Sequence, residues 1–200
     1  MELNRINDER NDDWILPISL DDDMLTYIKN SINKTIKNLE PIDLSPVSTR
    51  GSLSKQYKLY GGKDIDHIDK KIIDKISPLI ISNYKELFEI KDFELELVSS
   101  WTVLADKGGW HKIHNHIKSR EHVYDNISIV MYLESPEHEF HYPGDFYIVY
   151  EDKINGYLNY MEMTVTPGTV FVMPSKLMHG AYPASGKRQT LNFEFDIIEK

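Results

Sequence analysis

Histidine is unevenly distributed along this chain, and it is the residue type most able to do chemistry here. All but one of the histidines lie in the second half, at positions His111, His114, His116, His122, His138, His141 and His179. Residues two apart on an extended segment project from the same face, so His114 and His116 can both reach one metal ion. Histidines with this spacing also occur on surfaces without a ligand, so the pair alone does not establish a metal site.

A third histidine and an arginine follow later in the chain. His179 comes after the apolar run Thr169–Met173, and Arg188 lies nine residues beyond it. Neutral imidazole is a good ligand for iron, and a guanidinium group holds a carboxylate through two parallel hydrogen bonds. Thr190 faces the same side as Arg188 and could donate its hydroxyl to the same carboxylate. These residues predict a metal site beside an anchor for a carboxylate co-substrate.

The composition restricts what the metal and the partners can be. The chain has 200 residues and a formal net charge of −9, and it contains no cysteine. The absence of cysteine excludes disulfides, thiolate zinc sites and iron–sulfur clusters, so a metal must be held by nitrogen and oxygen. The negative charge opposes binding to nucleic acid, because that affinity comes mainly from cations that neutralise phosphates. We therefore expect no nucleic-acid partner.

The location is predicted from two features of the sequence. No apolar run approaches the length that crosses a bilayer. The first residues, Met1–Arg10, are polar and acidic, whereas a signal peptide has a basic start and an apolar centre. We expect a cytoplasmic protein with no membrane partner, and a homodimer is one arrangement that the sequence leaves open.

The first half of the chain has the pattern of helices. Apolar residues recur at helical spacing over Asp21–Leu39, after aspartates that suit the positive end of a helix dipole. A second helical stripe covers Ile65–Ile76, and the pattern resumes after Pro78, so two helices or one bent helix fit equally well. The segment Leu44–Lys63 is rich in serine, glycine and lysine and is predicted to be a long loop.

The second half has the pattern of strands. A strand is predicted over Asp92–Leu104, because apolar and acidic residues alternate in its first part. Further strands are predicted over Asn126–Leu133, Asp145–Tyr150, Tyr157–Val165, Thr169–Met173 and Gln189–Ile197. Short strands separated by turn residues are typical of a jelly roll or barrel. We expect one domain over residues 1–200, in which residues 1–90 form a helical support and residues 91–200 form a jelly-roll core with the metal site.

Four blocks of the sequence resemble a known family in their order and spacing. They are Gly108–His116, Ser128–Leu133, Phe171–His179 and Arg188–Phe193. They resemble blocks of the iron(II)- and 2-oxoglutarate-dependent oxygenases related to prolyl hydroxylases. The resemblance implies a double-stranded β-helix, with Fe(II) and 2-oxoglutarate as cofactors. It also implies hydroxylation of a C–H bond in an amino-acid residue or a small molecule, with release of succinate and CO2.

The resemblance assigns roles to particular residues. His114 would be the first iron ligand and His179 the distal one, while His116 stands where most members of the wider superfamily have a carboxylate. A third imidazole leaves the metal site more positive by one charge than the common site of two histidines and one carboxylate. The co-substrate would be bound by Arg188 and Thr190 at its far carboxylate, with Tyr132 as an additional hydroxyl donor.

Several alternatives remain open at this point. Either His116 or an acid completes the metal site; Glu121 fits a cupin-type motif, and Asp106, Asp125 and Glu134 fit less well. The matching alternative functions are a cupin-type metalloenzyme without 2-oxoglutarate and a non-catalytic jelly-roll binding module. His111 could contact the site but is expected to be exposed. A small-molecule or peptidyl substrate is expected to meet loops at Leu44–Lys63 and His138–Gly144.

Overall fold

The fold consists of two antiparallel sheets and two helices over the residues that the computed structural model describes, namely 4–5, 13–42, 54–88, 92–116, 126–136, 145–152 and 156–199. The larger sheet has the strand order β1 (Asn4–Arg5), β2 (Trp14–Ser19), β9 (Thr169–Pro174), β6 (Asn126–Glu134), β11 (Arg188–Glu199), β4 (Phe93–Ala105) and β3 (Ser54–Tyr60). The smaller sheet has the order β5 (His111–His114), β10 (Met178–Ala181), β7 (Phe146–Asp152) and β8 (Tyr157–Met163).

Both helices occur where the apolar spacing predicts them. Helix α1 (Asp22–Ile36) begins after Asp21, whose carboxylate accepts a hydrogen bond of 2.7 Å from the backbone N–H of Met24 and so caps the helix. Helix α2 (Lys70–Phe88) continues through Pro78 as one helix, which decides between the two arrangements that the sequence allowed. No helix in the described parts of the chain is long and apolar enough to cross a membrane.

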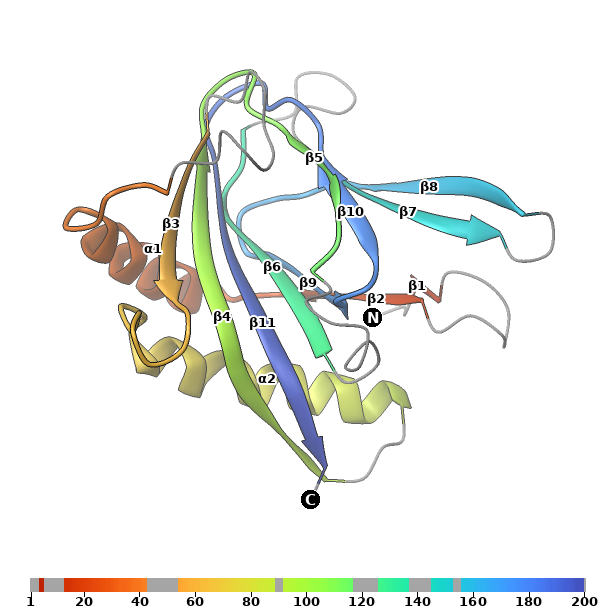
Figure 1. Ribbon diagram of the computed structural model, residues 1–200, viewed down its shortest axis with the longest axis horizontal. Coiled ribbons are helices and arrows are strands. Elements are labelled where there is room, and N and C mark those ends of the chain that lie inside the picture. Colours follow the sequence, from red (N-terminus) through yellow and green to blue (C-terminus); the bar gives the residue numbers. More distant parts are fainter. Residues whose placement is uncertain are drawn as a thin grey trace.

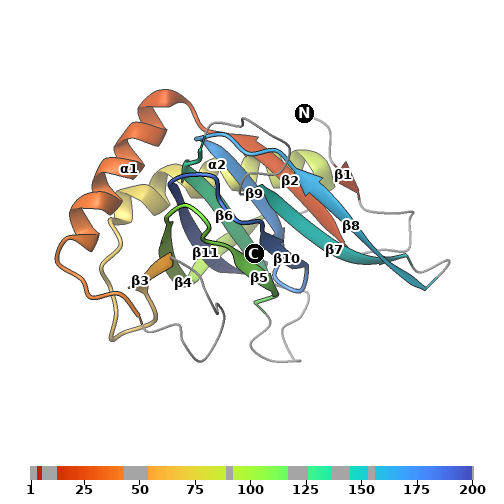
Figure 2. The same ribbon diagram turned by 90° about the horizontal axis from the view of Figure 1, so that it is seen from above.

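The larger sheet lies between the helices and the smaller sheet, as Figures 1 and 2 show. One face packs against α1 and α2 through a core that includes Ile32, Ile76 and Phe193. The other face packs against the smaller sheet through a second core that includes Phe146 and Phe171, whose rings stack at 4.8 Å between centroids. This sandwich of two antiparallel sheets is the predicted jelly roll.

Strand β11 shows how the sequence divides the two faces. Its apolar residues Leu191, Phe193 and Phe195 belong to the core beneath the helices. The intervening polar residues face the space between the sheets, because side chains alternate along a strand. These polar residues are all buried: Arg188, Thr190, Asn192 and Glu194. Four buried polar side chains on one face of a strand are unusual for the interior of a sandwich, and buried polar groups require partners.

The first half of the chain contributes strands as well as helices. The loop prediction for Leu44–Lys63 is wrong over Ser54–Tyr60, which form β3 and pair with β4; residues 43–53 lie outside the described residues. Strand β2, which was not predicted, pairs with β9. Local composition could not indicate β3, because a strand at a sheet edge depends on the neighbour it pairs with more than on its own propensity.

Candidate metal centre

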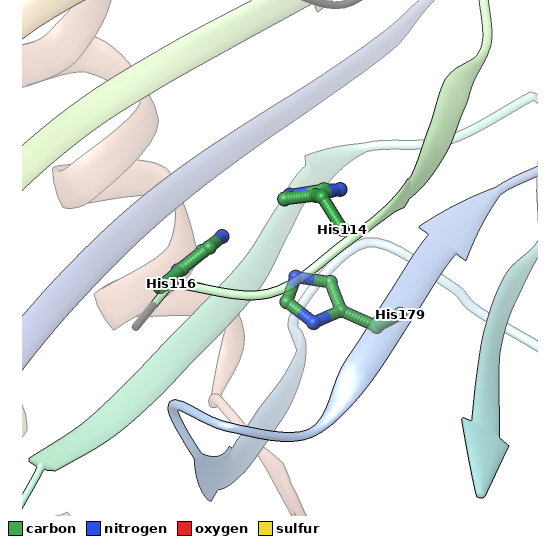
Figure 3. A group of neighbouring side chains, drawn as sticks. All are labelled: His114, His116 and His179. Atoms are coloured by element: carbon green, nitrogen blue, oxygen red, sulfur yellow. The ribbon is translucent and has the colours of Figure 1, made fainter. Parts of the chain in front are cut away.

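Three histidines from two neighbouring strands meet between the sheets. His114 on β5 and His179 on β10 are direct partners in the antiparallel pairing of those strands. His116 follows β5 after one residue, so it projects to the same side as His114. One ligand nitrogen from each ring lies within 4.8 Å of the others, and Figure 3 shows the three imidazoles gathered around a common space. The three predicted metal ligands are therefore close enough to hold one ion.

Backbone carbonyls orient two of the rings. Nδ1 of His114 lies 2.8 Å from the carbonyl oxygen of Lys112, and Nδ1 of His179 lies 2.9 Å from that of Leu177. A carbonyl oxygen only accepts, so Nδ1 carries the hydrogen in both rings and donates it. The lone pair of each neutral ring is then on Nε2, the atom left for a metal.

Burial keeps these imidazoles neutral. The pKa of His179, which is only 3 % exposed, is lowered to about 3, chiefly by burial and further by the neighbouring His114. Burial also lowers the pKa of His114. Metal ions bind the neutral form of histidine, so His114 and His179 do not need to lose a proton near neutral pH before they bind a cation.

The donor set fits a divalent transition metal. Imidazole nitrogen suits iron, zinc, copper and nickel, and three protein ligands leave coordination positions for other groups. Second partners that fix each ring, such as the two carbonyls, are usual at metal-binding histidines. The chemistry of these donors therefore fits the Fe(II) that the family resemblance implies.

A pocket opens from the histidines toward the larger sheet. Its lining includes Arg188, which is 3 % exposed and donates a hydrogen bond of 2.9 Å from Nη1 to the carbonyl oxygen of Tyr182. Its Nη2 also donates to the carbonyl oxygen of Gly109, at 3.4 Å. Burial lowers the pKa of Arg188, but a guanidinium remains a cation in proteins. The lining of the pocket thus combines the three histidines with a positively charged side chain.

Two hydroxyl groups lie beside this arginine. Thr190 on β11 and Tyr132 on β6 are direct partners in the strand pairing, and both line the pocket. Burial raises the pKa of Tyr132 to about 12, so its hydroxyl stays protonated and can donate. The hydroxyl of Thr190 accepts from the side-chain amide of Asn192 at 3.2 Å, which leaves its own hydrogen to donate elsewhere.

The structure brings the predicted residues His114, His116, His179, Arg188, Thr190 and Tyr132 into this one pocket. Their individual roles remain predictions. The expectation that His111 is exposed is wrong: its ring is half-buried, lines the same pocket and lies 5.8 Å from that of His114. Burial first, and the charge of Arg188 second, lower the pKa of His111 to about 3. A single sequence could not show this burial, which depends on the opposite sheet.

The acids considered as a third ligand lie elsewhere or outside the described residues. Asp106 is exposed, and Glu134 forms an ion pair with Lys29 at 3.1 Å. Glu121 and Asp125 fall outside the described residues, as do His122, His138 and His141. The cupin-type alternative, which depends on Glu121, therefore stays a prediction.

Glu194 is an acid near the histidines that sequence reasoning missed. Its Oε1 lies 3.4 Å from Nδ1 of His116, and the two side chains are 10 % and 7 % exposed. A signal was present in the alternation of β11, where the reasoning that placed Thr190 on the side of Arg188 extends to Asn192 and Glu194. The sequence gives no indication, however, that position 194 lies opposite residue 116.

Comparison with known proteins gives structural likeness only. No protein-family model matches the sequence, and no curated protein matches it. A Pseudomonas putida prolyl-4-hydroxylase is 14 % identical with a TM-score of 0.57, over 93 % of this chain and 92 % of the other. An oxidoreductase of the 2OG-Fe(II) oxygenase family from Burkholderia pseudomallei is 14 % identical with a TM-score of 0.62. The match covers 92 % of this chain and 84 % of the other.

A third similar structure is HygX from Streptomyces hygroscopicus with nickel and 2-oxoglutarate bound. It is 13 % identical with a TM-score of 0.59, over 91 % of this chain and 82 % of HygX. Together with the two-sheet topology, these likenesses confirm the predicted fold: the protein has the jelly roll of the 2-oxoglutarate oxygenases.

Proposed function

We propose that the protein is a non-haem Fe(II)- and 2-oxoglutarate-dependent oxygenase. The observation that carries the proposal is a single pocket whose lining contains both the three clustered histidines and a buried arginine. This arrangement suits a ligand that offers a metal-chelating group and, a few bonds away, a carboxylate. The fold shared with HygX, whose structure contains nickel and 2-oxoglutarate, supports the same assignment.

His114, His116 and His179 would hold Fe(II) through Nε2. When bound, Fe(II) supplies with 2-oxoglutarate and O2 the oxidising chemistry that yields succinate, CO2 and a hydroxylated substrate. The protein's part is to hold the reactants in order. Because carbonyl oxygens fix the rings of His114 and His179, the ligands need little rearrangement when the metal binds.

Arg188 would bind the far carboxylate of 2-oxoglutarate, since a fixed guanidinium presents several donors in one plane. Its hydrogen bonds to the backbone of Tyr182 and Gly109 restrict the orientation of that plane. The hydroxyls of Tyr132 and Thr190 would donate to the same carboxylate. Val130 and Phe146, which also line the pocket, limit the entry of water around these polar contacts.

The substrate would be an amino-acid residue in a peptide or a small molecule. Of the segments expected to meet it, residues 44–53 and His138–Gly144 lie outside the described residues, whereas Ser54–Tyr60 form strand β3. A cytoplasmic location and a homodimer remain predictions from the sequence.

The proposal is tested by 2-oxoglutarate binding and turnover. Under anaerobic conditions, isothermal titration of 2-oxoglutarate into Fe(II)-loaded protein should give a saturable complex, and in air the protein should release succinate. Arg188→Ala should weaken binding by about 10- to 150-fold, because it removes a charge-assisted contact of roughly 1.5–3 kcal/mol and leaves the carboxylate without a cation. Lys187→Ala is the matched control, since it removes the neighbouring exposed cation.

Two results would contradict the proposal. Equal binding by wild-type protein and Arg188→Ala would show that the arginine does not anchor the co-substrate. Metal uptake with no effect of 2-oxoglutarate in any assay would favour a metalloenzyme of the cupin type instead.

A further inference from the structure

His116 occupies the place of the third metal ligand, and a buried acid lies directly behind its ring. We propose that Glu194 is a positioning residue of the metal centre: it fixes His116 in the form that presents Nε2, and it supplies the negative charge that a third imidazole does not bring. The inference rests on the proposed function, because it assumes that His116 binds the metal.

The register of the larger sheet places Glu194 at this point. Glu194 on β11 is the direct strand partner of Ser128 on β6, and both side chains reach Nδ1 of His116. The distances from Nδ1 are 3.4 Å to Oε1 of Glu194 and 3.1 Å to Oγ of Ser128. The imidazole therefore has its Nδ1 edge against the larger sheet.

Glu194 removes an ambiguity that the serine leaves. The hydroxyl of Ser128 can donate to Nδ1 or accept from it, and it is also 2.9 Å from the hydroxyl of Ser175. A carboxylate only accepts, and its lone pairs repel a lone pair on Nδ1. The presence of Glu194 thus favours the ring form with hydrogen on Nδ1 and the lone pair on Nε2. The distance of 3.4 Å exceeds that of a strong N–H···O bond, so Glu194 acts mainly through its charge.

The rest of the ring's surroundings are consistent with a fixed ligand. The backbone N–H of His116 donates to the carbonyl oxygen of Ser175 at 2.9 Å, which ties this segment to the end of β9. The edge-on ring of Trp101 lies 5.1 Å from the imidazole. The backbone hydrogen bond and the ring of Trp101 limit where the imidazole can lie. Glu194 then favours the form of the ring in which Nε2 faces the metal.

The charge balance gives Glu194 a second role. A divalent metal with three neutral imidazoles keeps both positive charges, whereas the common site of two histidines and one carboxylate keeps one. Glu194 would supply the negative charge that the third ligand lacks, from the far side of the His116 ring. Its contact with Nδ1 places it behind the ring, so it acts through His116 rather than as a ligand. Carboxylates in this position make the imidazole a stronger ligand, and their loss typically weakens metal binding 10- to 100-fold.

The first test needs no metal. In metal-free protein labelled with ¹⁵N-histidine, NMR should show His116 with hydrogen on Nδ1, and Glu194→Ala should convert it to the other form or to a mixture. An unchanged His116 signal in Glu194→Ala would overturn the positioning role, whatever the metal or the reaction.

The second test measures metal affinity. Glu194→Gln keeps the size and an acceptor oxygen but loses the charge, and it should weaken Fe(II) binding 10- to 100-fold, as judged by chelator competition without oxygen. Glu194→Asp, which keeps the charge, should retain most of the affinity. Asp196→Asn removes the same charge two residues along β11 and should bind as the wild type does. Equal affinities for Glu194→Gln and Asp196→Asn would overturn the charge role.

A double substitution separates this inference from the proposed function. His116→Asp restores a carboxylate at the third ligand, so adding Glu194→Gln in that background should leave Fe(II) affinity unchanged or improve it, because two adjacent anions no longer repel each other. The same loss in both backgrounds would show that Glu194 acts independently of His116. A protein that binds Fe(II) with this dependence but does not bind 2-oxoglutarate would refute the proposed function and leave the role of Glu194 standing.

Discussion

Replacing Tyr132 by phenylalanine removes one oxygen atom from the pocket and little else. The side chain is 1 % exposed and lies in the core between the sheets, with its ring edge-on to Phe171 at 6.3 Å between centroids. Phenylalanine preserves that packing. If the hydroxyl donates to the far carboxylate of 2-oxoglutarate, its loss removes a hydrogen bond to a charged group, worth about 1.5–3 kcal/mol. The dissociation constant for 2-oxoglutarate should then rise about 10- to 150-fold.

The assay is anaerobic calorimetric titration of 2-oxoglutarate into Fe(II)-loaded Tyr132→Phe, together with urea unfolding of the metal-free protein. Tyr182→Phe is the control, because it removes a tyrosine hydroxyl that donates to Glu162 at 2.7 Å outside the pocket; its 2-oxoglutarate affinity should match that of the wild type. Unchanged affinity in Tyr132→Phe would refute a role for this hydroxyl and leave the residue as packing alone. Equal losses in both variants would indicate a general effect on the fold.

Two further predictions concern pH and packing. Burial lowers the pKa of His179 in the folded protein to about 3, whereas a histidine ordinarily has a pKa of 6.5, so the unfolded chain takes up the proton first. The metal-free protein should therefore lose stability as pH falls below 6.5. His179→Gln should reduce that loss by at most about 1.4 kcal/mol per pH unit in urea unfolding, and an unchanged slope would contradict the assigned burial. Gly180→Ala would place a Cβ in steric conflict with the hydroxyl group of Tyr147, so we expect a loss of about 1–3 kcal/mol of stability. Adding Tyr147→Ala should recover part of it, and full stability of Gly180→Ala alone would show that the ring moves aside freely.

The sequence by itself determined the character of the strands and the type of site. Alternating apolar residues reflect burial of one face of a strand, so β4, β6 and β11 could be located from local pattern alone. The spacing of His114 and His116 placed two imidazoles on one side of an extended segment. The order of four sequence blocks gave the family resemblance, and that resemblance implied the jelly-roll fold. The likenesses to solved structures confirm this fold.

Only the tertiary structure decided which distant residues meet. Strand β3 exists because β4 offers it a partner, and His111 is half-buried because the smaller sheet faces the larger one. Glu194 lies behind His116 because β11 pairs with β6 in a register that sets Glu194 opposite Ser128. A shift of one residue in that register would turn Glu194 toward the helices. Local sequence sets which face a side chain takes, whereas the pairing of strands far apart in the chain sets what that side chain contacts.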